Sequence, residues 1–271
     1  MDSGNIGFVL LCAAFVFVMT PGLAMFYGGL VRKKNVVNTM MTSIFIIGVG
    51  IVMWVLFGYS LSFAPSGNVF IGDFRWLGLE GVSLTEGYTD DASIPNMVFS
   101  AFQMMFAVIT PALITGAVAG RMKFKSIFVF TIFWSLIVYY PLAHMVWGQG
   151  GLLGADGIGA LDFAGGDVVH ISSGVSALVL CILLGKRHDY EHSIYRIHNI
   201  PTVVLGASLL MFGWFGFNAG SALAADGLAA HAFMTTGVSA AAAMLSWSSA
   251  ILSRTKSLRL SVQAQVWLQV L

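Results

Sequence analysis

The sequence predicts an all-α protein, a polytopic bundle of transmembrane helices, and three observations lead to that prediction. Of its 271 residues, 58% are hydrophobic and only 9% are charged, whereas soluble domains carry about 25% charged residues. The mean hydropathy is +0.86. Apolar runs of about 20 residues, the length that crosses a bilayer, recur along the whole chain. A soluble enzyme and a disordered protein are therefore both excluded as the default.

Seven apolar runs lie between charged or turn-rich breaks, and each is predicted to be a span of one membrane domain, residues 1–252. No basic segment or convincing cleavage site accompanies the first run, which is interpreted as a span and not as a signal peptide. The spans are predicted at about 6–31, 37–63, 95–118, 125–147, 169–185, 201–222 and 230–252.

The basic residues predict the orientation of these spans. If the N-terminus lies outside, 12 of the 13 Lys and Arg residues fall in inner loops or the C-terminal tail, and only Arg75 lies outside. Cytoplasmic loops carry the excess of Lys and Arg in membrane proteins. We therefore expect a multi-pass protein of the cell membrane with its N-terminus outside and its C-terminus inside.

Charge, cysteine and histidine content give no sign of a cofactor or metal. The net charge of +1 argues against a nucleic-acid partner. Cys12 and Cys181 both lie in apolar runs, so neither a disulfide framework nor a cysteine metal site is expected. His188, His192 and His198 share an inner loop, but their spacing lacks a partner set, and a solvated loop is the better interpretation.

Polar residues at membrane depth are candidates for function because burying them in lipid is costly. His170 opens the fifth span between Gly165-Gly166 and Ser172-Ser173. A lone histidine between helices is often only a structural hydrogen-bonding residue. A neutral imidazole in a narrow neck also offers one donor and one acceptor to a small polar solute that loses its water.

Aromatic residues near the outer side suggest a site for a cation. Phe106 lies four residues after Phe102 and shares its helix face, Trp147 ends the fourth span, and Phe217 and Ser221 share a face of the sixth. Each ring alone is typical of an aromatic belt or of ordinary packing. Together the rings are candidates for the walls of a vestibule that recruits a cation, because ring faces attract cations.

Asp162 lies eight residues before His170 and has two possible roles. An ionised carboxylate near a cation path can be a ligand. It can also accept backbone N–H groups at the start of the fifth span. We favour the structural role, which holds the geometry of the neck, with electrostatic help to a passing cation as a secondary effect.

The chain closely resembles the ammonium transporter (Amt/Rh) family. Matching segments occur in the family's order across roughly residues 6–250. They are 21–32 (PGLAMFYGGLVR), 101–110 (AFQMMFAVIT), 143–148 (AHMVWG), 159–171 (GALDFAGGDVVHI) and 213–221 (GWFGFNAGS).

The resemblance implies a fold, a substrate and roles for particular residues. It implies an eleven-helix bundle built from an inverted repeat, assembled as a homotrimer with one pore per subunit. Trp147, Phe106 and Ser221 would recruit ammonium, Phe106 and Phe217 would form the gate, and His170 would be the first of two pore histidines. Asp162 would be the structural aspartate. Ammonium would be deprotonated near the gate and ammonia would pass along a hydrophobic pore.

The chain also departs from the family's pattern. Only seven of the eleven helices are expected, so the inverted repeat is incomplete, and the helix with the second pore histidine is missing. The tail on which PII-type signalling partners often act is missing too. We expect polar groups such as Asn218 to lack partners, and the chain to be inactive by itself. Residues 253–271 do not fit the family's pattern. When the possible codons of this segment are translated in the adjacent reading frame, they permit a family-like eighth helix. We therefore expect a reading-frame change near residue 253.

Three other functional classes are alternatives to a transporter. An ammonium sensor or receptor of the same family is the main alternative to a transporter. A membrane enzyme that uses His170 and Asp162 as an acid–base pair lacks a nucleophile, a metal cluster and a cofactor motif. A seven-helix receptor fits the number of spans but not the family motifs. The sequence therefore predicts ammonium/ammonia transport and no catalysis.

Overall fold

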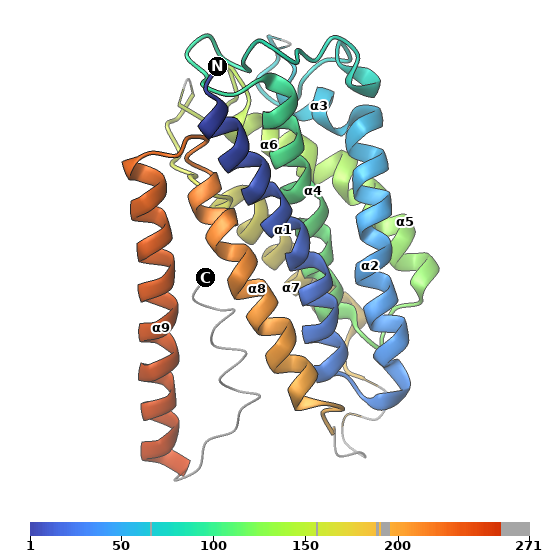
Figure 1. Ribbon diagram of the computed structural model, residues 1–271. Coiled ribbons are helices and arrows are strands. Elements are labelled where there is room, and N and C mark those ends of the chain that lie inside the picture. Colours follow the sequence, from blue (N-terminus) through green and yellow to red (C-terminus); the bar gives the residue numbers. More distant parts are fainter. Residues whose placement is uncertain (66, 156, 188–189, 191–195, 256–271) are drawn as a thin grey trace.

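The computed structural model describes residues 1–65, 67–155, 157–187, 190 and 196–255. All regular elements within these ranges are helical (Figure 1). The α-helices are α1 (Ser3–Leu30), α2 (Val36–Met53), α3 (Tyr59–Phe63), α4 (Asn96–Val118), α5 (Phe124–Trp134), α6 (Tyr140–Trp147), α7 (Ser172–Leu184), α8 (Ile200–Gly220) and α9 (Gly227–Thr255). Of the residues discussed above, His188, His192 and the tail from 256 to 271 lie outside the described ranges.

Within the described ranges, seven helical stretches are long and apolar enough to cross a membrane, as the sequence predicts, and the chain is a multi-pass membrane protein. Three of these stretches continue through short π-helical segments, at Trp54–Gly58, Ser135–Tyr139 and Gly166–Ile171. The spans are Ser3–Leu30, Lys33–Phe63, Asn96–Val118, Phe124–Trp147, Gly166–Leu184, Ile200–Gly220 and Gly227–Ser253. Their ends differ from the predicted ones by a few residues only.

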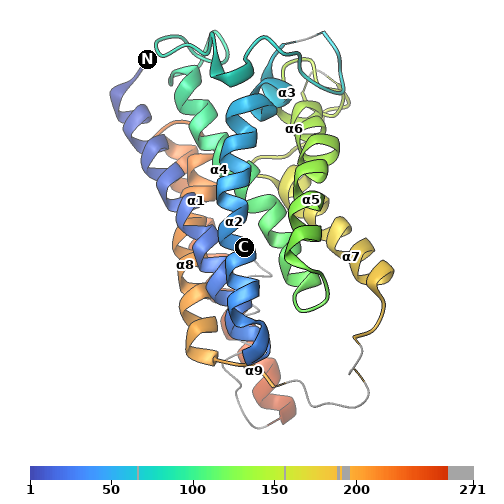
Figure 2. The same cartoon turned by 90° about the vertical axis from the view of Figure 1, so that its right-hand side faces the viewer.

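The two ends of the bundle differ in their connections. The N-terminus lies at the same end as the long connection between α3 and α4, and the connection between α6 and α7 lies there too (Figures 1 and 2). The short basic connections after α1 and α4 lie at the opposite end. We call the end with the N-terminus the outer end, in accordance with the orientation that the basic residues predict.

Glycines allow α1 and α8 to cross at close range. A Cβ atom on Gly206 would lie 2.4 Å from the backbone nitrogen of Phe26 and 2.6 Å from the carbonyl oxygen of Gly22. One on Gly213 would lie 2.6 Å from the carbonyl oxygen of Phe15. Any larger side chain would push the helices apart, so the contact depends on the small residues that favour close packing in lipid. This contact fixes the place of α8 and of the aromatic residues near its end.

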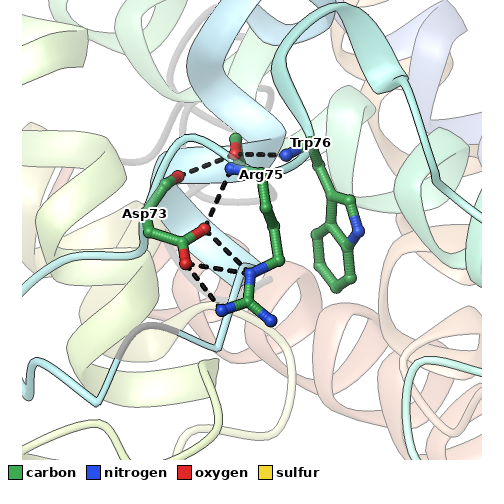
Figure 3. Close-up of polar contacts among 4 residues, drawn as sticks. Asp73, Arg75 and Trp76 are labelled. Atoms are coloured by element: carbon green, nitrogen blue, oxygen red, sulfur yellow. Dashed lines mark hydrogen bonds and ion pairs between the residues drawn. The ribbon is translucent and has the colours of Figure 1, made fainter.

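A network of polar contacts anchors the connection between α3 and α4 at the outer end. The hydroxyl of Ser60 donates to the carbonyl oxygen of Asp73 at 2.7 Å and accepts from the backbone N–H of Trp76 at 3.0 Å. The side chains of Arg75 and Asp73 pair at 2.7 Å (Figure 3). The ring of Trp76 stacks on that of Tyr59, with centroids 5.4 Å apart. The connection is therefore tied to the top of α3.

Helix α9 lies at the edge of the bundle and packs on α8 (Figure 1). Phe215 and Phe233 stack with centroids 4.3 Å apart. The side-chain N–H of Asn218 donates to the hydroxyl of Thr236 at 2.9 Å. The expectation that Asn218 lacks a partner is therefore wrong, because the seventh span itself supplies one.

Candidate functional site

A cavity of about 550 Å³ opens at the outer end of the bundle. Its walls come from the start of α1, the connection before α4, the outer ends of α4 and α6, and the connections that follow α6 and α8. Six aromatic side chains contribute to the lining: Tyr88, Phe99, Phe102, Phe106, Trp147 and Phe163. The cavity has the size and the largely apolar walls that are typical of small-molecule sites.

The three residues predicted to recruit a cation meet in this cavity. Phe106 and Trp147 are perpendicular, with ring centroids 6.0 Å apart, and Ser221 lines the same wall. The indole N–H of Trp147 donates to the backbone oxygen of Asp162 at 3.0 Å, which fixes the ring. The hydroxyl of Ser221 donates to the carbonyl oxygen of Phe217 at 2.8 Å, so its own oxygen is available to accept from a solute.

The two residues of the predicted gate are in contact, and one of them, Phe106, lines the cavity. The rings of Phe106 and Phe217 have centroids 4.3 Å apart and an interplanar angle of 35°. Each residue is only 1% exposed, so both rings are buried. Phe106 belongs to α4 and Phe217 to α8, and both helices pack on α1.

His170 lies beyond the two phenylalanines. Its ring stacks on Trp214, with centroids 5.7 Å apart and planes within 9°, and lies 6.0 Å from Phe217. It belongs to the π-helical segment Gly166–Ile171, a kind of segment that is frequent at functional sites. Successive ring contacts thus begin in the cavity wall and join Trp147, Phe106, Phe217 and His170 in that order.

Asp162 holds the backbone at the start of the fifth span. One carboxylate oxygen accepts from the backbone N–H groups of Gly165 and Gly166 at 2.5 and 2.8 Å, and the other accepts from Asp167 and Val168 at 2.8 and 3.0 Å. Gly165 has a φ of 105°, which favours glycine. This geometry is the capping role favoured from the sequence, and Asp162 also contributes to the cavity wall.

The electrostatics of the cavity favour a cation. Asp91 and Asp162 line it, and no lysine or arginine of the described chain does. Arg75, the one basic residue predicted at the outer end, is paired with Asp73, and this pair lowers the pKa of the Asp73 carboxyl. Among the described residues no group of histidines, cysteines and acids is arranged to hold a metal ion.

Two residues of the wall were not singled out as site residues in the sequence. Phe102 touches Phe106 in an edge-to-face arrangement, with centroids 5.0 Å apart, and was noted only for sharing its helix face. Gln103 is 9% exposed and lines the cavity. The position of Gln103 in the sequence could have identified it as a wall residue. It lies three residues before Phe106 and four after Phe99, so it shares the helix face that carries those two rings.

Comparison with known proteins identifies the family. Seven apolar spans in the described part of the chain, with an aromatic-lined cavity at one end, define a multi-pass membrane protein. The model of the ammonium transporter family matches residues 7–265, past the position near 253 where a frame change is predicted. The chain belongs to the ammonium transporter family.

Individual relatives agree with this assignment. The chain is 52% identical over 247 residues to an ammonium transporter of Bacillus subtilis, which covers 91% of this chain and 59% of the relative. It is 46% identical over 266 residues to one of Mycobacterium tuberculosis, covering 91% and 56%. The crystal structure of Saccharomyces cerevisiae Mep2 matches with a TM-score of 0.88 at 34% identity, covering 98% of this chain and 59% of that chain. The chain therefore spans less than two thirds of the length of these relatives. The two from Bacillus subtilis and Mycobacterium tuberculosis are named ammonium transporters.

Proposed function

We propose that this chain carries the outer half of an ammonium transport path. Ammonium enters the outer cavity as a cation and binds between the faces of Trp147 and Phe106, with Ser221 as a hydrogen-bond acceptor. The observation that carries the proposal is the composition of the cavity, in which ring faces and two carboxylates converge and to which no basic side chain of the described residues contributes. Such a wall attracts a compact cation by about 0.5–2 kcal/mol per ring.

The next step in the proposal is loss of the charge at the gate. Phe106 and Phe217 close the floor, and the ring of His170 follows among apolar neighbours. A charged solute loses its hydration there, and that cost is far higher for ammonium than for ammonia. Deprotonation near the gate therefore lowers the barrier, and a neutral imidazole beyond it supplies a donor and an acceptor to the uncharged solute.

Asp162 has a positioning part in this proposal. Its four backbone hydrogen bonds hold the turn that presents His170, and its backbone oxygen orients Trp147. A carboxylate in the wall also makes the cavity more favourable for a cation. Assembly as a homotrimer and a PII-type partner on the cytoplasmic side follow from the family resemblance and stay predictions for this chain.

A chimera tests the proposal. Residues 1–252 are joined to the remaining helices of the Bacillus subtilis relative and expressed in a host that lacks ammonium transport. We expect growth on limiting ammonium and saturable uptake of labelled methylammonium. A chimera that reaches the membrane and binds methylammonium without restoring growth would favour the sensor alternative. A membrane-inserted chimera with neither binding nor uptake would contradict the proposed function.

A further inference from the structure

Two acidic residues, Asp91 and Asp162, line the outer cavity, and their side chains are engaged very differently. The carboxylate of Asp162 accepts four backbone N–H groups, from residues 165–168. Successive backbone N–H groups form a favourable site for an anion, so the protein itself already compensates this charge. No hydrogen bond or ion pair within the described part of the chain involves the side chain of Asp91. Its charge is therefore available to a solute.

Asp91 lies nearer the mouth of the cavity than the rings of the predicted gate do. It is an exposed residue of the connection before α4, whereas Phe106 is 1% exposed, and both residues line the cavity. Of the described residues, no lysine or arginine belongs to the lining, and neither does Met1, which carries the α-amino group. A cation that enters the cavity therefore meets the carboxylate before it reaches Phe106.

A carboxylate attracts cations over a longer distance than a ring face does. Attraction between charges in water extends over about one Debye length, which is roughly 8 Å at physiological ionic strength. A ring face acts on a cation only within about 6 Å of its centroid. A cleft lined by charge of one sign raises the local concentration of the opposite ion. One uncompensated carboxylate at the mouth therefore raises the concentration of cations beside the deeper rings.

We propose that Asp91 is a substrate-recruiting residue of the outer cavity, whose carboxylate concentrates ammonium-type cations at the mouth and raises the affinity of the aromatic site. The inference rests on the proposed function and adds a binding residue to it. It gives the two acids different principal roles, since Asp91 attracts the cation and Asp162 holds the turn that presents His170. The attraction acts through solvent, so the contribution of Asp91 falls as the ionic strength rises.

The test measures binding of methylammonium to the purified 271-residue chain, in nanodiscs of zwitterionic lipid, by calorimetry. Binding is compared at ionic strengths of about 0.15 M and about 1 M, between which the Debye length falls from about 8 Å to about 3 Å. Asp91→Asn keeps the shape of the side chain and removes its charge. At the lower ionic strength we expect it to weaken binding about fivefold, the effect of one unit charge at contact distance in water. At the higher ionic strength we expect less than about a twofold effect.

Two further variants separate charge from shape and from the field of the whole outer surface. Asp91→Glu keeps the charge and should keep the affinity of the wild-type chain. Asp90→Asn is the matched control, because Asp90 is exposed in the same turn but does not line the cavity. It should weaken binding much less than Asp91→Asn does. Asp91→Ser replaces the asparagine variant, with the same expectations, if that variant does not fold.

Several results would overturn the inference while leaving the proposed function intact. Equal weakening by Asp90→Asn and Asp91→Asn would mean that the outer surface as a whole attracts the ion. Weakening that persists at high ionic strength, or that also occurs in Asp91→Glu, would mean that Asp91 only shapes the cavity. Unchanged binding by Asp91→Asn would mean that its carboxylate does not attract the ion. A wild-type chain that binds no methylammonium would instead contradict the proposed function, and the inference with it.

Discussion

At the scale of single residues, His170 is the polar group whose position in the proposed path has the sharpest consequence. Its ring lies beyond the Phe106–Phe217 pair and stacks on Trp214. An aspartate there would place a negative charge among aromatic rings, where burying a charge is costly. The carboxylate would also bind a passing cation and slow its release. We expect His170→Asp to change methylammonium uptake by the chimera at least tenfold.

His198→Asp is the matched control for that substitution. His198 is exposed at the opposite end of the bundle, and the same change of charge there should leave uptake unaltered. Unchanged uptake by the His170→Asp chimera would show that the histidine does not line the path.

Asp73 provides a residue-scale prediction that depends on pH. Hydrogen bonds and charge from Arg75 lower the pKa of this carboxyl below its ordinary value. A carboxyl with a lower pKa in the folded protein contributes stability above its unfolded pKa and loses that contribution as the pH falls through the folded pKa. We expect its titration midpoint, followed by NMR, to lie below about 3.9 and to rise in Arg75→Gln. An identical midpoint in both proteins would mean that the pair does not persist in solution.

At the scale of elements, the turn before α7 depends on one carboxylate. Asp162 accepts four backbone N–H groups, whereas Asp226 accepts one, from Ala229 at the start of α9. Loss of a helix cap costs about 0.5–2 kcal/mol. We expect Asp162→Ala to lower the free energy of unfolding by at least about 2 kcal/mol and by more than Asp226→Ala, measured by thermal unfolding. Equal effects of the two substitutions would be inconsistent with the turn described here.

The helices are also the level at which the sequence was most informative. Runs of about 20 apolar residues between basic loops predict the seven spans closely, because the bilayer fixes their length. The π-helical segments were not predicted from the sequence. A π-helix has one more residue in the turn than an α-helix, and a run of apolar residues looks the same in either case. The prediction that Trp147, Phe106 and Ser221 lie in one site came from the family resemblance. The periodicity of a single helix does not reveal which other helix packs against it. Asp91 was not singled out, because the partners of a side chain are visible only in three dimensions.

At the scale of the whole molecule, the segment that follows His170 carries exposed apolar side chains, and we infer that one side of the proposed path faces lipid. Beside His170, Ile171 is 58% exposed, and further along α7 the exposed fractions are 60% for Leu178 and 77% for Leu183. A solute beyond the gate would therefore meet lipid instead of a closed wall. We expect the 271-residue chain in liposomes to show no saturable ammonium flux, whereas the chimera does. Specific, saturable flux through the chain alone would contradict this expectation.

We propose that the outer cavity binds ammonium-type cations on the face of Trp147, and binding of methylammonium to the purified chain is the decisive measurement. Trp147→Leu removes one ring face from the cavity, and Trp247→Leu removes a half-exposed ring on α9 as the matched control. We expect Trp147→Leu to weaken binding roughly 5–30-fold, equivalent to about 1–2 kcal/mol, and Trp247→Leu to have no effect. Equal affinity of the wild-type chain and Trp147→Leu would contradict the proposal.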